Sequence, residues 1–323
     1  MPRLSYYRRI FSAYLFGGKS HLTFWHETPA ANPHATAGEL GEYYMLFAEK
    51  ADYAGAYDPD GVPLLDYHGR IGVQHNPIAI AQYGLGNYNL FRQRGDLERR
   101  KKFFLTADWL RAHLEQNSSG LAVWNHYFDW EYRDTLRAPW YSALAQGQGI
   151  SVLVRAHKES GDERYLEAAE RALASFFRPT HAGGVAFTDD RGDLWFEEYI
   201  VSPPTHILNG FIWAGWGVYD YFLATSDRTV QELFSRAVET LLRNLDRYDL
   251  GFWSLYEQSG TRLPMVASHF YHQLHIVQLR IMRRLTGEDK FARVADRWES
   301  YSRSRSKRTR ALFYKTAFKL CYY

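Results

Sequence analysis

The sequence predicts a mainly α-helical protein: an α/α toroid, or barrel, of repeated helical hairpins with a β-hairpin arm at its N-terminal side. Helical spacing of apolar residues covers most of the chain beyond residue 77. Glycine turns at Gly120, Gly184 and Gly251 recur at intervals of roughly 65 residues. Helix pairs that repeat in this way stack as an open solenoid or close into a ring. Trp and Tyr residues follow each turn, which favours a ring around a common cleft, because separate loops would expose these side chains to water.

The N-terminal region differs from the rest of the chain. Residues 1 to 40 show no regular pattern apart from a short helix expected near residues 4–15. Closely spaced tyrosines between residues 41 and 72 are interrupted by Asp58-Pro59-Asp60-Gly61, a sequence typical of a tight turn. We therefore expect an extended hairpin whose apolar side covers another part of the protein or another subunit.

Beyond this arm, the chain divides into helices joined by short turns. Pro77 lies in the first turn of the first helix, and Ser160-Gly161 is typical of a helix C-terminus. The sequence predicts an N-terminal segment with the arm (1–72), a barrel domain (73–305) and a basic C-terminal tail (306–323). The predicted helices after the first cover residues 97–113, 142–159, 162–177, 205–224, 228–245, 269–286 and 289–302.

Composition narrows the classes of function. A net charge of +3 is too small for a general nucleic-acid-binding protein. Cys321 is the single cysteine, which excludes an intrachain disulfide and a cysteine metal cluster. Aromatic residues make up 17% of the chain, so we expect some of them to line a cleft and stack on sugar rings. No apolar run approaches the ~20 residues that span a bilayer.

Both ends of the chain carry basic residues. Three arginines near the N-terminus precede a short, tyrosine-containing stretch at 10–17, which we interpret as a weak amphipathic segment and not a signal peptide. A cytoplasmic or peripheral location is therefore expected. The C-terminal cluster is interpreted as a frayed, solvated tail, or alternatively as a docking site for a polyanion. Its members are Arg303, Arg305, Lys307, Arg308, Arg310, Lys315 and Lys319.

The chemistry of the predicted cleft centres on Glu197-Glu198-Tyr199, just before a long apolar helix. Taken alone, an acidic pair there is more often a solvated helix entry. In a closed ring, however, this segment would meet Tyr256 and the segment 271–275, and carboxyl and phenol groups can act as general acids and bases. His272 and His275 share one helical face, a spacing that also suits a metal, but no third ligand follows at a recognisable spacing. We expect hydrogen bonding by these histidines, with no metal and no cofactor.

Several blocks, in order, resemble the D-glucuronyl C5-epimerases of heparan sulfate and heparin biosynthesis. The most specific is WYSALAQGQGIS at 140–151, and the resemblance covers most of the chain from Gly41 onward. The other blocks lie at 76–85, 107–110, 153–156, 197–199, 208–211, 219–220, Tyr256, 271–272, 297–298 and 300–301.

The resemblance implies a C-terminal α/α barrel accompanied by a β-hairpin. Animal members also carry a β-sandwich, but too few residues separate Gln82-Tyr83 from Asp108-Trp109 to hold one, so this chain looks like a minimal, microbial form. The family is dimeric, with the hairpin helping to close the site. A homodimer acting on an acidic polysaccharide is therefore expected, with no nucleic acid and no transmembrane segment.

Residue by residue, the family's catalytic glutamate and neighbouring tyrosine fall on Glu198 and Tyr199, and two further active-site tyrosines fall on Tyr256 and Tyr271. The chain departs from the family at an arginine whose offset is occupied by Ser259, and Arg262 lies slightly later. The residues predicted to bind substrate are Tyr141, Gln146, Gln148, Trp195, Asn209, Arg262, His272 and His275.

The implied reaction removes the C5 proton of a D-glucuronate in a heparosan or heparan-type chain and returns a proton to the opposite face, giving L-iduronate. Three alternatives remain open from the residues. A polysaccharide lyase would form the same carbanion and expel the C4 oxygen. A glycoside hydrolase would pair Glu198 with Glu197, Glu257 or Asp129. A polysaccharide-binding protein would keep the cleft without the chemistry.

Overall fold

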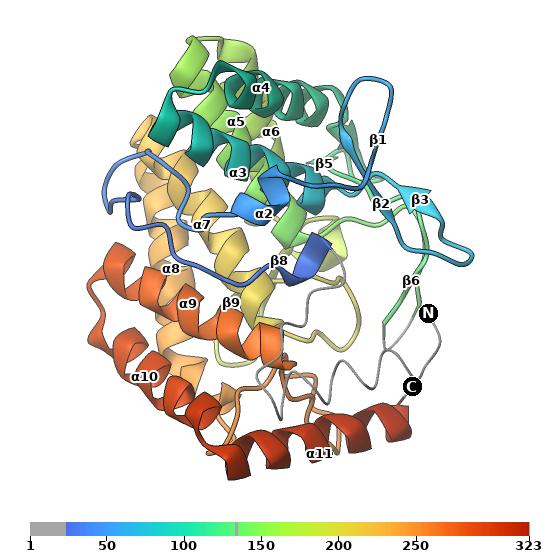
Figure 1. Cartoon of the computed structure of the whole chain (residues 1–323), viewed down its shortest axis with the longest axis vertical. Coiled ribbons are helices and arrows are strands. Elements are labelled where there is room, and N and C mark those ends of the chain that lie inside the picture. The colour runs from blue at the N-terminus through green and yellow to red at the C-terminus, as the bar shows by residue number, and fades with distance from the viewer. Residues whose placement is uncertain (1–23, 133–134, 323) are drawn as a thin grey trace.

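The computed structural model describes residues 24–132 and 135–322 (Figure 1). The short helix expected near residues 4–15 and the amphipathic segment at 10–17 lie outside the described residues.

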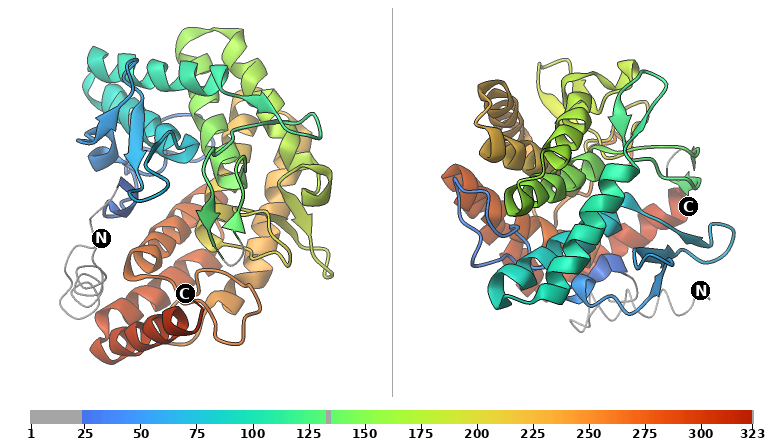
Figure 2. Two further views of the ribbon diagram at one scale, coloured as in Figure 1. Left: turned by 90° about the vertical axis from the view of Figure 1, so that its right-hand side faces the viewer. Right: turned by 90° about the horizontal axis from the view of Figure 1, so that it is seen from above.

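Four antiparallel helical hairpins form the body of the protein (Figures 1 and 2). The first helix of each hairpin packs against the first helix of the next, so α3, α5, α7 and α9 form the inner layer, with their partners outside. The predicted α/α barrel is thereby confirmed. The hairpins are α3 (Pro77–Arg94) with α4 (Leu97–Ala112), α5 (Ala143–Ser160) with α6 (Glu163–Leu173), α7 (Leu208–Thr225) with α8 (Arg228–Asn244), and α9 (His269–Thr286) with α10 (Asp289–Arg303).

Capping residues define the ends of these helices. The Asn76 side chain accepts hydrogen bonds from the backbone N–H groups of Ile78 and Ala79 at the start of α3. Gly161 and Gly287 adopt the left-handed conformation that ends α5 and α9. These signals are local, which explains why the predicted helix boundaries agree with the structure to within a few residues.

Glycines allow the inner helices α5 and α7 to approach closely. A Cβ atom on Gly147 would lie 2.6 Å from the Ala214 Cα, and one on Gly217 would lie 2.2 Å from the Gly147 carbonyl oxygen. Real side chains do not tolerate such distances, so the two backbones can touch only because these positions are glycine. The Gln-Gly-Gln-Gly sequence in α5 therefore has a packing role.

Short β-hairpins and 3-10 turns connect the outer helices to the next inner helices, on the side where the inner helices begin. All three hairpins are antiparallel, and in the third Phe187 pairs with Trp195. Their strands are β4 (Glu115–Gln116) with β5 (Ala122–Val123), β6 (Trp130–Glu131) with β7 (Thr135–Leu136), and β8 (Ala186–Thr188) with β9 (Leu194–Phe196). The 3-10 turns are η2 (Ala174–Phe177), η3 (Thr180–Ala182) and η4 (Leu245–Tyr248).

The N-terminal arm is shorter than the predicted hairpin. Its antiparallel sheet has the order β1 (Ala56–Tyr57), β2 (Pro63–Asp66), β3 (Val73–Gln74), and the expected turn joins β1 to β2. Asp58 closes this turn, because its side chain accepts a hydrogen bond from the Val62 N–H at 2.8 Å. Residues 41–55 were expected to belong to the hairpin but are not extended, and they include the short helix α2 (Ala48–Ala51). The 3-10 turn η1 (Phe24–His26) lies earlier, in the region for which no regular pattern was expected.

The segment 27–47 runs across the barrel and joins its core (Figure 1). Tyr43 and Tyr44 are buried against Trp216 of α7, so they are core residues and not part of an arm. Because the segment contacts all four inner helices, it ties the first hairpin to the last. Its hydrogen bonds are Tyr43 N to Asn89 Oδ1, Arg155 Nε to Gly41 O, Tyr44 Oη to Asp220 Oδ1, and Arg284 Nη1 to Asn32 O.

The C-terminal residues differ from the frayed tail that was expected. They form helix α11 (Arg305–Tyr322), which buries Leu312 and Phe318. The buried Lys315 Nζ donates to the Val266 carbonyl oxygen at 2.9 Å, so part of the basic cluster has a structural role. No helix in the described part of the chain is long and apolar enough to cross a bilayer.

Candidate active site

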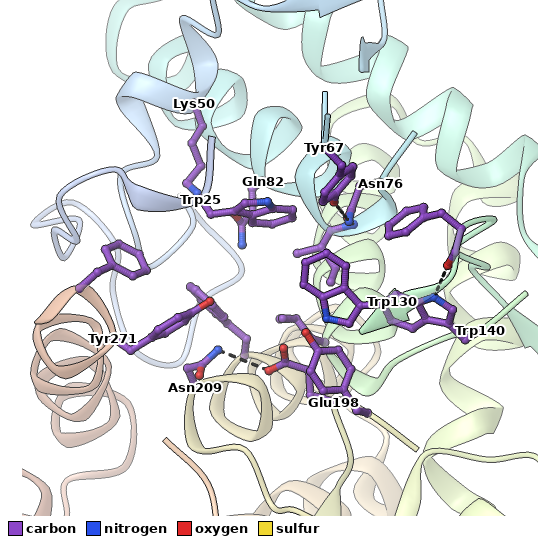
Figure 3. Close-up of a pocket in the computed structure, with 16 residues that line it drawn as sticks. Trp25, Lys50, Tyr67, Asn76, Gln82, Trp130, Trp140, Glu198, Asn209 and Tyr271 are labelled. Carbon is purple, nitrogen blue, oxygen red and sulfur yellow. Dashed lines mark hydrogen bonds between the residues drawn. The ribbon is translucent and has the colours of Figure 1, made fainter. Parts of the chain in front are cut away.

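A cavity of about 230 Å³ lies where the inner helices begin (Figure 3). Its wall is largely aromatic and includes polar side chains from α3 and α7. Such a combination is typical of small-molecule sites, in which apolar walls bind the ligand and a few polar groups orient it. The described residues of the wall are Trp25, Lys50, Tyr67, Asn76, Ile78, Gln82, Phe128, Trp130, Trp140, Leu144, Glu198, Tyr199, Asn209, Trp213, Phe270 and Tyr271.

The acidic pair after β9 is buried, and its two members have different surroundings. Glu197 accepts hydrogen bonds from the Nδ1 atom and the backbone N–H of His206, at 2.5 and 3.1 Å. Glu198 lies in the cavity wall (Figure 3). β9 ends at Phe196 and the chain bends at Glu198, so the two neighbouring side chains meet different surroundings. The structure therefore excludes the solvated helix entry and separates a structural carboxylate from one that can meet a ligand.

The environment of Glu198 favours its protonated form. Burial raises the pKa of this carboxyl from its ordinary value of 4.5 to about 8, and the negative charges of Glu257 and Glu197 act in the same direction. A hydrogen bond from Tyr199 lowers the pKa but does not compensate. A carboxyl group with such a pKa can exchange its proton near neutral pH.

Three tyrosines surround this carboxyl. The ring centroids of Tyr256 and Tyr271 are 4.8 Å apart. Burial raises the pKa of Tyr199, Tyr256 and Tyr271, and the charge of Glu198 raises each of them further. A hydrogen bond with Tyr256 opposes the rise at Tyr271. All three phenols are therefore neutral donors at ordinary pH. The structure also brings together the four residues that were predicted to be catalytic, with Glu198, Tyr199 and Tyr271 in the cavity wall and Tyr256 against Tyr271.

Helix α7 holds the Glu198 carboxyl in place. The Asn209 Nδ2 atom donates to Glu198 Oε2 at 3.4 Å. Directly beside it, a Cβ atom on Gly210 would lie 2.1 Å from the same oxygen, which leaves no room for a side chain. The Asn-Gly sequence at the start of α7 thus supplies one hydrogen bond and one close contact that fix the position of the carboxyl group.

The cavity wall also contains polar atoms without a hydrogen-bond partner in the described chain. These are Gln82 Oε1, Asn209 Oδ1 and Trp213 Nε1, all on buried side chains of the inner helices. Sugar hydroxyls, which both donate and accept, could pair with them. Gln82 and Trp213 were not predicted to be site residues, although a glutamine within the otherwise apolar start of α3 is a sequence signal for Gln82.

Five of the predicted substrate-binding residues are buried outside the cavity wall, where neighbouring groups of the chain occupy them. Gln146 bonds the backbone of Trp124, Ala122 and Ala172. His272 bonds Ser254 and the Trp298 carbonyl, and His275 bonds the same serine. Trp195 stacks on His206 at 4.3 Å, and Gln148 bonds Gln82 at 3.1 Å from behind the wall. We correct these assignments to packing and positioning.

Two further predictions also change. Tyr141 donates to the Gly183 carbonyl oxygen at 2.7 Å, away from the cavity. Arg262 is exposed in the loop before α9 and does not belong to the wall. Asn209 is the one predicted substrate-binding residue that lies in the wall.

Charged groups are scarce in the described wall, where Glu198 is the sole carboxylate and Lys50 the sole cation. The partners considered for a hydrolase pair lie elsewhere: Tyr132 donates to Glu257, and Asp129 pairs with Arg137 at 2.5 Å. Among the described residues, no group of three His, Cys, Asp or Glu side chains is placed to hold a metal.

Solved structures offer a weak likeness to the whole fold. The cellobiose 2-epimerase of Spirochaeta thermophila matches with a TM-score of 0.48 and 14% identity, over 93% of this chain and 85% of that one. The unsaturated glucuronyl hydrolase of Bacillus sp. GL1 matches with a TM-score of 0.47 and 15% identity, over 69% and 61%. Likeness of this degree says nothing about activity.

Sequence relatives are closer. The D-glucuronyl C5-epimerase of Caenorhabditis elegans is 34% identical over 215 residues, which are 62% of this chain and 35% of that protein. An uncharacterized protein of Methanocaldococcus jannaschii is 28% identical over 195 residues, 59% of this chain and 62% of that one. The chain therefore spans about a third of the first relative and three fifths of the second. The family model described as D-glucuronyl C5-epimerase C-terminus matches residues 116–300. Since this match covers more than half of the chain, the protein belongs to the D-glucuronyl C5-epimerase family.

Proposed function

We propose that this protein is an epimerase that inverts C5 of D-glucuronate residues to L-iduronate within a heparosan or heparan-type polysaccharide. One observation carries the proposal: a buried carboxyl, Glu198, faces the cavity amid three neutral phenols. Family membership and the name of the C. elegans relative support the same reaction.

The chemical problem is to remove a proton from the carbon next to a carboxylate. The leaving proton places a second negative charge on that group, so the site must supply a strong base and hydrogen-bond donors. Burial makes Glu198 a stronger base than an exposed carboxylate, because it raises the pKa to about 8. The ionised form of Glu198 takes the C5 proton.

Inversion requires a proton donor on the other face of the ring. Tyr271 is a neutral phenol in the same cavity, and its hydroxyl points into the cavity in Figure 3. Tyr271 gives its proton to C5, and the hydrogen bond from Tyr256 stabilises the phenolate that remains. Tyr199 donates to Glu198 and keeps its carboxylate oriented. Exchange with solvent then returns a proton to Tyr271 and removes one from Glu198, which completes the cycle without a cofactor.

The substrate ring would be held by the aromatic wall and by the amide groups of Gln82 and Asn209. Aromatic faces suit the C–H surface of a pyranose, and amides suit its hydroxyls. We also propose that the protein works as a homodimer, since Tyr67 of the N-terminal arm contributes to the wall and the arm would be steadied by a second subunit.

The experiment that tests this function is incubation with heparosan, and separately with its N-sulfated form, in deuterated water. NMR at the uronate C5 position and sizing of the chains are the readouts. Epimerisation gives deuterium at C5, iduronate signals and unchanged chain length. A product that absorbs in the ultraviolet would identify a lyase, and shortened chains without it would identify a hydrolase. Binding without exchange on either polymer would contradict an epimerase.

A further inference from the structure

A second, larger cavity of about 720 Å³ adjoins the cavity that contains Glu198. The walls of the two cavities share Trp25, Lys50, Tyr67 and Trp130. Figure 3 shows Lys50, Trp25 and Tyr67 on the side of the catalytic cavity opposite to Glu198. When one sugar of a polymer lies at Glu198, the adjoining sugar must lie next to it, and the adjoining cavity is placed to receive that sugar.

We propose that this second cavity is a binding subsite for the neighbouring sugar of the polysaccharide, and that Lys50 binds an anionic group of the chain at its entrance. The inference rests on the proposed function, because it assigns the position of a sugar relative to the reacting uronate. The anionic group is a carboxylate of the next uronate or an N-sulfate of the intervening hexosamine.

The position of Lys50 suits this role. Its side chain is 6% exposed and lies along aromatic rings, with Nζ 4.6 Å from the Phe24 centroid and 5.3 Å from that of Phe47. Nζ donates to the Phe24 carbonyl oxygen at 3.0 Å, and the carboxylates of Glu27 and Glu49 lie near enough to act on its charge. An ammonium has three N–H donors, so donors remain for a ligand.

Electrostatics also favour an anion here. Burial lowers the pKa of Lys50 to about 8, although the nearby charges of Glu27 and Glu49 act in the opposite direction. The amine is therefore still largely protonated at neutral pH, and an anion bound beside it would favour the charged form further. Glu27 and Glu49 compensate part of the charge of Lys50, and an anion at the boundary of the cavities would be held by the remaining N–H donors of Nζ through charge-assisted hydrogen bonds.

The rest of the second cavity suits a neutral, hydroxyl-bearing ring. Phe24, Trp25 and Tyr53 provide aromatic surface. Glu27, Glu49, Asp52 and Asp66 line this cavity but not the catalytic one. Carboxylates accept hydrogen bonds from sugar hydroxyls and repel additional anionic substituents. The subsite therefore accommodates one anionic group at Lys50 and disfavours heavily sulfated chains.

A structural role for Lys50, in which it only holds the N-terminal segment through Phe24, predicts different behaviour. Lys50→Met keeps the aliphatic packing and removes the charge, whereas Lys50→Arg keeps the charge. Lys315→Met is the matched control, since Lys315 is also buried and also donates to a backbone carbonyl, but lies in α11 outside both cavities.

The test compares heparosan polymer with the shortest heparosan oligosaccharide that undergoes C5 exchange, with kcat and KM measured for each variant. We expect Lys50→Met to raise KM for the polymer by roughly tenfold or more, with kcat little changed and activity on the short substrate within about twofold. Lys50→Arg should recover most of the affinity, and Lys315→Met should behave like the wild type. Equal losses on both substrates, or no loss on either, would overturn the subsite.

Two further measurements identify the anionic group and separate the subsite from the proposed function. The Lys50→Met penalty should be equal on N-acetylated and N-sulfated polymers if the anion is a carboxylate, and larger on the N-sulfated polymer if it is a sulfate. Binding of heparosan oligosaccharides, measured by the change in tryptophan fluorescence, distinguishes a failure of the Lys50 subsite from a failure of the epimerase function. If the wild type binds but catalyses no exchange, the epimerase assignment fails while the Lys50 effect on affinity still decides the subsite.

Discussion

Two groups of buried charge occupy opposite ends of the inner helices, and they differ in how their charges are compensated. Arg155 of α5 and Asp220 of α7 are both fully buried and paired at 2.6 Å. Arg155 also donates to the Ser151 and Gly41 carbonyl oxygens, and Tyr44 donates to Asp220. At the other end, Glu198 faces a cavity and has no cation within the described wall except Lys50, on the opposite side (Figure 3).

The comparison shows what pairing does to a buried charge. Burial alone would lower the pKa of Arg155, but the charge and hydrogen bonds of Asp220 raise it, so the guanidinium keeps its charge. Glu198 is buried beside like charges instead, and its pKa rises to about 8. Arg155 stabilises the fold, because it is paired with Asp220 and keeps its charge. Glu198 has no paired cation among the described residues and can transfer a proton, but its burial lowers the free energy of unfolding.

The sharpest way to test this contrast is Glu198→Gln. The amide cannot accept the C5 proton, so we expect turnover to fall by roughly 10³-fold or more while the protein remains folded. Deuterium incorporation and thermal unfolding are the measurements. Glu197→Gln is the control, because its carboxylate bonds His206 and its loss should reduce stability more than chemistry. An active Glu198→Gln variant would contradict the assignment of the base.

The opposite pattern is expected for Arg155→Met. Removing the guanidinium leaves Asp220 buried without its cation, which costs about 3–5 kcal/mol of the free energy of unfolding. Turnover per folded molecule should be unchanged, since the pair lies outside the cavity wall. Urea unfolding measures the loss. Replacing both residues by apolar ones should restore part of it, and a single variant as stable as the wild type would show that the pair is not structural.

Stability should depend on pH through Glu198. Its pKa is raised in the folded protein, so folding favours the protonated form, and this contribution is lost as pH rises from about 4.5 to about 8. The full shift corresponds to about 5 kcal/mol at 1.36 kcal/mol per pKa unit, and relaxation of the site will reduce it. Unfolding of wild type and Glu198→Gln between pH 5 and 9 should therefore diverge, with the variant more stable at high pH. Parallel curves would argue that this carboxyl is ionised normally.

A milder change tests the positioning of the carboxyl. Gly210→Ala would place a methyl group 2.1 Å from Glu198 Oε2, so the carboxyl must move, and we expect turnover to fall by roughly ten- to a hundredfold. Gly215→Ala in the same helix is the matched control, because the nearest atom to its Cβ is 4.0 Å away. That variant should retain activity and gain up to about 1 kcal/mol in helix stability. Equal activity of the two variants would remove the positioning role of Gly210.

The smallest effect is expected at Arg262. This arginine was predicted from sequence to bind substrate, but it is exposed and outside the cavity wall. Arg262→Ala should leave KM and kcat within about twofold, as most exposed substitutions do. Steady-state kinetics on heparosan measure both constants, and a large rise in KM would show that the loop before α9 closes over the bound chain.

Much of the barrel could be predicted from sequence because its signals are local. Helical periodicity, capping residues such as Asn76 and left-handed glycines such as Gly161 lie within a few residues of the boundaries that they set. The segment 27–47 could not be predicted in this way, because its place is set by Trp216, Asn89 and other residues far away in the sequence.

The structure places the predicted residues at or beside the cavity where chemistry and family resemblance singled them out, and mostly outside its wall where only residue type did. Gln146, His272 and His275 are polar residues in apolar helices, as Gln82 is, and sequence does not distinguish those that meet a ligand from those satisfied by their neighbours. Lys50 was missed because the segment before β1 was expected to form part of a hairpin.

The sequence by itself determined the helical hairpins and the family, since periodicity, capping and ordered motifs are properties of short stretches. It also singled out Glu198, Tyr199 and Tyr271, which lie in one cavity wall, and Tyr256, which packs against Tyr271. Only the tertiary structure decided that Glu198 and not Glu197 faces the cavity, that Arg155 pairs with Asp220, and that a second cavity adjoins the first with Lys50 in both walls. These outcomes depend on which distant segments pack together, and the same packing sets the burial and the neighbouring charges from which each pKa follows.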